Sequence, residues 1–152
     1  MTKSGFLLNN QLTDFSFKAY DNNNRIVNNI QPGKRPRSSM APTIILKDNI
    51  PVYVLGSPGG SNIIGYVVNA VVSMIDWKMN PQKAASMPHR INKFGTYYLE
   101  KNRNLEKLGN SLKEMNYEVK LTNFLSGLNI IHVNEKLFGG SDHRREGLAI
   151  GN

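Results

Sequence analysis

The sequence predicts a mixed α/β layered domain, because several strand-like segments and hairpins are separated by helical patterns. A chain of 152 residues has the length of one domain and can bury about 70% of its unfolded surface. It contains no cysteine, so no disulfide supports the core, and it shows no internal repeat. We therefore expect one layered domain over residues 1–152.

The first third of the chain is expected to hold a short strand and a surface loop. Gly5–Asn9 has the apolar character of a short buried strand, and polar side chains follow it. Residues 16–33 show little periodicity and contain an Asn-rich run and Pro32-Gly33, which is typical of a surface loop.

A β-hairpin is predicted next, and it runs into a glycine-rich turn. Pro42–Lys47 and Val52–Leu55 have strand character, and Asp48-Asn49 between them is a turn signal. The second strand ends in the turn Gly56–Gly60, in which Gly59 and Gly60 lack Cβ atoms. The oxygen of a ligand can approach such backbone N–H groups closely at the positive end of a following helix. Paired glycines also simply connect a strand to a helix, and the turn by itself favours this structural explanation.

The segment after this turn predicts the central helix of the domain. Its apolar residues form two series that each step by four positions, the pattern of one helix face. They are Ile63, Ile64, Val67, Val68, Val71, Val72 and Ile75. Ser61 and Asn62 stand where N-cap side chains stand. Because valine and isoleucine are weak helix formers, packing must stabilise this helix, and Val52–Leu55 is the expected partner strand.

Two further helices are predicted after the central one. Asn80-Pro81 indicates an N-cap followed by the first residue of a short helix that ends before Pro88. A second amphipathic helix with Asn104 as its cap is expected on the outer face. Its apolar residues are Leu105, Leu108, Leu112 and Met115.

The remaining segments predict strands and a tail. The strands are expected at Thr96–Glu100, Tyr117–Leu121 and Leu128–Val133. A hairpin at Asn134-Glu135 is expected to return through Leu137 and Phe138, and Gly139–Gly151 is expected to be a polar tail.

The net charge of +8, from 19 Lys and Arg against 11 Asp and Glu, suggests an acidic partner. One hypothesis is therefore a non-enzymatic basic interaction module that binds acidic partners or nucleic acid through residues 34–37 and 78–107. Most charges are scattered singly, however, and no aromatic residues interleave with a basic stripe as single-strand binders require. Nucleic acid is not the favoured partner.

Histidine chemistry and metal binding have little support in the sequence. His89, His132 and His143 are scattered, the carboxylates show no ligand spacing, and Ser57 lacks the Gly-x-Ser-x-Gly frame of a nucleophile elbow. His132 alternates within an apolar strand and is predicted to be structural. The first ten residues have too short an apolar core for a signal peptide, and no membrane-spanning stretch is predicted, which leaves the localisation open.

Four blocks of the sequence carry a specific resemblance. They are residues 7–16, residues 32–44, Gly56–Ser61 and Ser141–Gly147. In their residues, order and spacing these blocks resemble the small subunit of the γ-glutamyltransferases, also called γ-glutamyltranspeptidases or glutathione hydrolases. The resemblance covers nearly the whole chain and is most secure over residues 5–82 and 137–147.

The resemblance implies an α+β fold of the N-terminal-nucleophile hydrolase type, an αββα sandwich built from two subunits made by self-cleavage. Residues 1–152 would be a single partial domain, the C-terminal region of the small subunit. Members of the family are acyltransferases and hydrolases of glutathione metabolism. They take the γ-glutamyl group of glutathione or related compounds onto a threonine and pass it to water or an amino acid, without a cofactor.

The resemblance also implies roles for individual residues. Gly59 and Gly60 would supply the oxyanion-hole amides. Ser38 and Ser39 would bind the α-carboxylate of the γ-glutamyl group, and Gln11 and Asp14 its α-ammonium. These roles suit the chemistry, because hydroxyls can donate to a carboxylate, a carboxylate pairs with an ammonium, and fixed amides match an oxyanion.

The sequence departs from the family at the nucleophile. The family's small subunit begins with the catalytic threonine, and that segment and the large subunit are not found here, so we expect a product of a split or decayed gene. It would be inactive alone or need a complementing polypeptide. Thr2 is not expected to replace the threonine, because only Lys3 and Ser4 separate it from Gly5 and three extended residues reach about 10 Å. Without its partner, the sheet is expected to expose an edge and self-associate.

Overall fold

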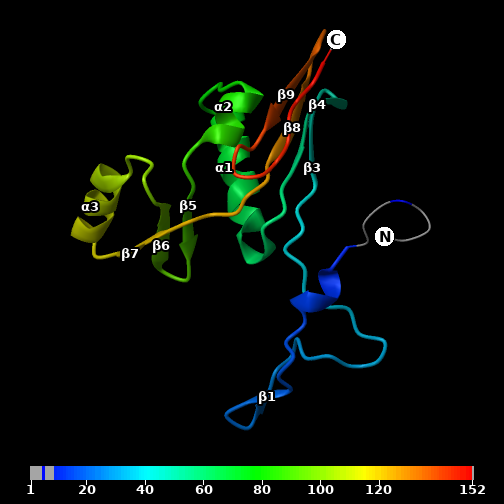
Figure 1. Cartoon of the computed structure of the whole chain (residues 1–152), viewed down its shortest axis with the longest axis vertical. Helices are drawn as coiled ribbons and strands as arrows, with labels where there is room; N and C mark the ends of the chain where they lie inside the picture. Colours follow the sequence, from blue (N-terminus) through cyan, green and yellow to red (C-terminus); the bar gives the residue numbers. More distant parts are fainter. Residues whose placement is uncertain (1–4, 6–8, 152) are drawn as a thin grey trace. The chain divides into compact units, whose positions relative to one another are not determined.

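The computed structural model of the chain describes residue 5 and residues 9–151 (Figure 1). They divide into two compact units, one up to Ser39 and one from Met40 onward. Thr2 and most of the predicted strand Gly5–Asn9 lie outside the described residues.

The first unit contains only short elements. They are η1 (Gln11–Asp14), β1 (Tyr20–Asp21) and β2 (Asn24–Arg25). The two strands pair antiparallel around Asn22 and Asn23, whose φ angles are 45° and 66°. Asparagine tolerates this left-handed backbone, so the Asn-rich run forms a tight hairpin. The predicted loop over residues 16–33 is mostly exposed, as expected, but it is not structureless.

The second unit is built around a four-stranded antiparallel sheet. In order across the sheet, its strands are β3 (Thr43–Lys47), β4 (Ile50–Gly56), β8 (Asn129–Val133) and β9 (Leu137–Ser141). Both predicted hairpins are therefore confirmed. Asp48 and Asn49 connect β3 to β4 with φ angles of 54° and 63°, and this left-handed turn matches the twist of paired strands.

The prediction of a polar tail from Gly139 is wrong for its first residues, which belong to β9. Gly140 lies directly against α2 (Pro81–Ser86), where a Cβ atom would come within 2.4 Å of the Pro81 backbone. Gln82 fixes this contact, because its side-chain amide donates to the Ser141 carbonyl and accepts from the Ser141 N–H at 2.9 and 3.2 Å. The glycines thus permit a close strand-to-helix approach rather than a loop.

α1 (Ile63–Ile75) and α2 cover one face of this sheet and form the core with it (Figure 1). The span of α1 and its packing against the preceding strand are confirmed, since Leu55 of β4 shares the core with α1. The predicted face is partly wrong, because Ile64 and Val68 are 56% and 54% exposed. The buried residues of α1 are Ile63, Tyr66, Val67, Ala70, Ser73 and Met74. The apolar series predicted the helix but not its rotation, since β-branched residues occur on both sides of it.

The predicted helix caps have different outcomes. Asn80 caps α2, and its side-chain oxygen accepts from the Lys83 N–H at 2.8 Å. Asn62 makes no side-chain cap bond to α1, because the 3-10 turn η2 (Gly60–Asn62) precedes that helix. The predicted Asn104 cap is also wrong. Asn104 has a φ of 54°, and Leu105 holds the cap position of α3.

A second, three-stranded sheet completes the unit. Its elements are β5 (Arg90–Lys93), β6 (Thr96–Glu100), α3 (Glu106–Glu114) and β7 (Glu118–Thr122). β5 and β6 form a hairpin, whereas α3 connects β6 to the parallel strand β7. The sequence did not predict β5, because Ile91 is the one apolar residue in that strand. α1 and α2 lie between the two sheets (Figure 1), and the fold is α+β, as expected.

The Asn80 cap provides a test of local stability. Asn80→Ala removes the acceptor for the Lys83 N–H and should lower the free energy of unfolding by about 1 kcal/mol. Asn80→Ser retains a hydroxyl acceptor and should lose less. Urea denaturation of the three proteins measures the difference, and equal losses in both variants would contradict a capping role.

Candidate active site

The glycine turn presents two adjacent backbone donors at the start of α1. β4 ends at Gly56, and Gly59 and Gly60 follow with φ angles of 141° and 56°, which favour glycine. The Gly59 carbonyl accepts from the Asn62 N–H at 3.2 Å. Within the described part of the chain, neither the Gly59 nor the Gly60 amide donates to another residue. Both amides are therefore available to an external acceptor near the positive end of the helix dipole.

Gly59 is required by a close contact as well as by its backbone angle. A Cβ atom on Gly59 would lie 2.4 Å from Cε2 of Tyr66, a fully buried ring on the first turn of α1. A Cβ atom on Gly60 would meet nothing within 4 Å. The Tyr66 ring therefore forms the floor beneath Gly59, and the space beside Gly60 is open.

A second segment braces the turn from the side. The Ser57 hydroxyl accepts from the Gly127 N–H at 3.1 Å. A Cβ atom on Gly127 would lie 2.9 Å from the Pro58 ring, so this glycine also permits a close approach. Arg145 holds the same segment, because its guanidinium donates to the Leu125 carbonyl at 3.1 and 3.3 Å. The conformation of the turn therefore depends on residues far away in the sequence.

A buried polar cluster lies behind the Tyr66 ring, which is 4.3 Å from the ring of His89. His89 contacts the Ser126 hydroxyl at 2.6 Å, and Ser126 donates to the Asp142 carboxylate. Arg144 forms ion pairs with Asp142 at 3.0 Å and with Glu100 at 2.6 Å. Glu100 also accepts from the His89 backbone N–H at 2.9 Å.

These contacts set the charge state of the cluster. Burial lowers the pKa of His89 to about 4, and Arg144 acts in the same direction. Burial raises the pKa of Glu100 and of Asp142, but the hydrogen bonds from Arg144 to both carboxylates, from the His89 amide to Glu100 and from Ser126 to Asp142 outweigh it and hold both below their usual values. At neutral pH the cluster therefore contains two carboxylates, one guanidinium and a neutral imidazole.

The cluster brings a serine, a histidine and an aspartate together, which the sequence did not predict. The direction of its hydrogen bonds differs from that in a catalytic triad. A carboxylate can only accept, so the Ser126 proton points to Asp142 and the His89 Nε2 atom donates to Ser126. In a triad this nitrogen accepts the serine proton. The cluster thus positions the segments around Tyr66, and His89 does not act as the base for Ser126.

The first unit contains the other four predicted site residues. Gln11 and Asp14 share the turn η1, and both are half-buried, whereas Ser38 is exposed and Ser39 half-buried. The Asn28 side chain links these two segments, because it donates to the Asp14 carbonyl at 2.7 Å and accepts from the Arg37 N–H at 2.9 Å. Asn28 therefore connects the segment of Gln11 and Asp14 to the segment of Ser38 and Ser39. The sequence did not predict this role, because Asn28 lies in an Asn-rich loop.

Other predicted features have simpler surroundings. His132 lies in β8, the strand predicted for it, with its ring stacked 4.5 Å from that of Tyr53. In the part of the chain that the structure describes, no three His, Asp or Glu residues cluster as metal ligands would, and no helix is long and apolar enough to span a membrane.

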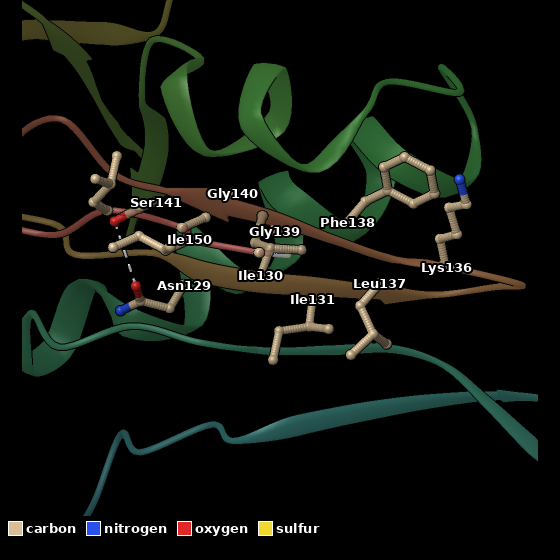
Figure 2. Close-up of a pocket in the computed structure, with 13 residues that line it drawn as sticks. Asn129, Ile130, Ile131, Lys136, Leu137, Phe138, Gly139, Gly140, Ser141 and Ile150 are labelled. Atoms are coloured by element: carbon tan, nitrogen blue, oxygen red, sulfur yellow. Dashed lines mark hydrogen bonds between the residues drawn. The ribbon is translucent and has the colours of Figure 1, made fainter.

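A groove of about 770 Å³ follows β8 and β9 and includes none of the candidate residues (Figure 2).

Several cations assigned to the hypothetical basic module contact groups of the chain itself. Lys34 donates to the Asn29 side chain at 3.2 Å, and Arg103 donates to the Ser86 carbonyl at 2.6 Å. The guanidinium of Arg90 lies 4.9 Å from the Trp77 ring. These contacts hold the cations within the fold.

Comparison with known proteins identifies the family. The sequence profile described as Gamma-glutamyltranspeptidase matches residues 1–152. The chain belongs to the gamma-glutamyltranspeptidase family. It is 37% identical over 153 residues to the glutathione hydrolase proenzyme of Bacillus subtilis (strain 168), covering 97% of this chain and 25% of that protein. It is 46% identical over 91 residues to the Escherichia coli (strain K12) glutathione hydrolase proenzyme, covering 57% of this chain and 16% of that protein.

Solved structures of gamma-glutamyltranspeptidases share the fold. A mutant of the Helicobacter pylori enzyme superposes with a TM-score of 0.79 at 35% identity, over 94% of this chain and 83% of the solved chain. This confirms the incomplete α+β fold of the N-terminal-nucleophile hydrolase type. The chain spans a quarter or less of the length of the two curated gamma-glutamyltranspeptidase relatives named above.

The contact between Gly59 and Tyr66 can be tested by a matched pair of glycine variants. Gly59→Ala brings a methyl group within 2.4 Å of Cε2 at the edge of the Tyr66 ring and strains the backbone, so it should cost about 2–3 kcal/mol of stability. Gly56→Ala is the control, because a Cβ atom at Gly56 meets nothing within 4 Å. Urea denaturation of both variants checks this, and equal stabilities would contradict the requirement for glycine at position 59.

The buried imidazole predicts a loss of stability in mild acid. The folded chain holds the pKa of His89 at about 4, whereas an exposed histidine titrates near 6.5. The unfolded chain therefore binds the extra proton between these values. The stabilisation is complete above about pH 6.5 and falls by about 3 kcal/mol as the pH drops through 4. Loss of the Glu100 and Asp142 charges continues the decline at lower pH, because both carboxyls have lowered pKa values.

Urea denaturation between about pH 7 and pH 4.5 measures this slope. His89→Gln should remove most of it. His132→Gln, which changes a ring in β8 outside the cluster, is the control and should keep most of the slope. A full slope in His89→Gln would assign the effect to other groups.

Proposed function

We propose that this chain supplies the substrate-binding and oxyanion-stabilising part of a glutathione hydrolase or γ-glutamyltransferase. In this proposal the chain does not catalyse alone, and a second polypeptide carries the nucleophilic threonine and the large subunit. The observation that carries the proposal is the pair of Gly59 and Gly60 amides, which donate to no other described residue and lie at the start of α1.

The two amides suit the charge that develops during acyl transfer. The threonine oxygen attacks the γ-carbonyl carbon of the substrate, and negative charge collects on the carbonyl oxygen. The Gly59 and Gly60 N–H groups would donate to this oxyanion, an interaction that contributes about 3–4 kcal/mol per donor in other acyl-transfer enzymes. The C–N bond then breaks, the amine leaves with a proton, and water or an amino acid amine takes the acyl group from the ester.

The first unit would recognise the γ-glutamyl group. Asp14 supplies a carboxylate and Gln11 an amide oxygen for the α-ammonium, while the hydroxyls of Ser38 and Ser39 donate to the α-carboxylate. Support comes from the Asn28 side chain, which joins the Asp14 backbone to Arg37, the residue next to Ser38. Each charged group of the γ-glutamyl head needs a hydrogen-bond partner in the site, because a charge without one would lower the binding energy.

An apolar sheet face supports the requirement for a second polypeptide. Ile44, Val54 and Ile131 are aligned across β3, β4 and β8 and are 63%, 36% and 44% exposed. Ile131 and Leu137 point to the same side of the β8–β9 hairpin, opposite Phe138 (Figure 2). This side faces away from α1 and α2, whose core contains Leu55 and Ile130. A second layer of strands would bury this face.

The proposal is tested by measuring glutamate release from glutathione. The chain alone should release none, and activity should appear when it is combined with the large subunit and threonine-bearing segment of the Bacillus subtilis relative. Asp14→Asn should then lower kcat/KM about 10-fold to 100-fold, because it removes one charged hydrogen-bond partner.

Asp21→Asn is the matched control, since it removes an exposed carboxylate from β1 of the same unit. Glutamate release by the chain alone, or equal kcat/KM for Asp14→Asn and Asp21→Asn in the complex, would contradict the proposal.

A further inference from the structure

The hairpin β5–β6 is held against the first half of α1, next to the glycine turn. Gly65 makes this possible, because a Cβ atom there would lie 2.9 Å from the Ile91 side chain. The Asn69 side chain of α1 donates to the Arg90 carbonyl at 3.0 Å. The hairpin turns between Lys93, the last residue of β5, and Thr96, the first residue of β6. The end of β5 therefore has a fixed position relative to α1.

This arrangement places a lysine beside the candidate oxyanion site. The Lys93 ammonium donates to the hydroxyl of Ser61, the residue that follows Gly60, at 3.1 Å. The same ammonium lies 5.9 Å from the centre of the Tyr98 ring, within the range of a cation–π contact. Lys93 is half-buried, so these contacts restrict its side chain.

The partners of Lys93 are neutral. Among the residues that the structure describes, no carboxylate forms an ion pair with its ammonium. An ammonium has three donors, and the Ser61 hydroxyl takes one of them. The remaining donors and the positive charge are available to an anionic group near Ser61.

We propose that Lys93 is a specificity-determining residue that binds the terminal carboxylate of the leaving group of a γ-glutamyl peptide. This inference rests on the proposed function, in which the γ-carbonyl oxygen lies at Gly59 and Gly60. The roles given to Gln11, Asp14, Ser38 and Ser39 account for the two charges of the γ-glutamyl group. They leave the carboxylate at the other end of glutathione without a partner.

The dimensions agree with this assignment. The cysteinyl-glycine end of glutathione spans two residues, about 7 Å when extended. Ser61 lies one residue beyond Gly60, about 3.8 Å along the chain, and the Lys93 ammonium lies 3.1 Å from the Ser61 hydroxyl. The length of the leaving group is therefore comparable to this separation, as a carboxylate bound by the ammonium and a carbonyl bound at the glycine amides would require.

The test compares two donors that share the γ-glutamyl group. Glutathione has a leaving group with a carboxylate, and a γ-glutamyl anilide has a neutral one. In the complex with the threonine-bearing polypeptide, Lys93→Met should raise KM for glutathione about tenfold, the effect of one charged hydrogen bond, with kcat unchanged. KM for the anilide should stay at the wild-type value. Lys93→Arg should restore much of the glutathione KM.

The controls separate this inference from the proposed function. Lys107→Met removes the same charge from an exposed position on α3 and should change neither KM. If Lys93→Met changes both KM values equally, or neither, the assignment of Lys93 is wrong while the proposed function stands. If the wild-type complex cleaves neither donor, the proposed function is wrong and the role of Lys93 falls with it.

Discussion

Arg144 joins the separate layers of the second unit. Its guanidinium forms ion pairs with Glu100 at the end of β6 and with Asp142 just after β9, and it donates to the Met87 carbonyl after α2 at 2.9 Å. Its side chain is 6% exposed. Removing one member of such a buried cluster leaves an uncompensated charge, which costs about 3–5 kcal/mol. The two sheets and the end of α2 therefore depend on one guanidinium for their mutual arrangement.

The same cluster reaches the candidate active site through rings rather than charges. Neutral His89 connects Ser126 and Glu100 to Tyr66, and Tyr66 lies directly beneath Gly59. Burial lowers the pKa of His89. Arg144 lowers it further, because a protonated imidazole would place a second cation beside that guanidinium. The glycine turn is thus supported by groups that are themselves fully paired, while its own amides remain free to bind a ligand.

The chain combines a complete small core with surfaces that an isolated domain rarely exposes. The core residues of α1, α2 and β4 are nearly inaccessible to solvent, but the opposite sheet face exposes a row of branched apolar side chains. A helix layer on one side and a bare apolar sheet face on the other correspond to half of an αββα sandwich. This arrangement agrees with a chain that spans a quarter or less of the two curated relatives compared with it. A stability measured for this chain alone therefore does not include the free energy that a partner would add by burying the exposed sheet face.

The sequence alone determined the elements whose signals are local. The Asp48-Asn49 turn, the Asn80 cap and the span Ile63–Ile75 each depend on residues a few positions apart, and all three were predicted correctly. The resemblance of four short blocks also sufficed to identify the family and the type of fold.

Only the tertiary structure decided the contacts between distant segments. His89 and Ser126 are 37 positions apart, Glu100 and Arg144 are 44 apart, and Ser61 and Lys93 are 32 apart. No periodicity encodes these pairs, because they form when α1, with Gly65 and Tyr66 on its surface, packs against both sheets. The rotation of α1 was undetermined for the same reason. Apolar residues lie on both of its sides, and the packing partners decide which side is buried.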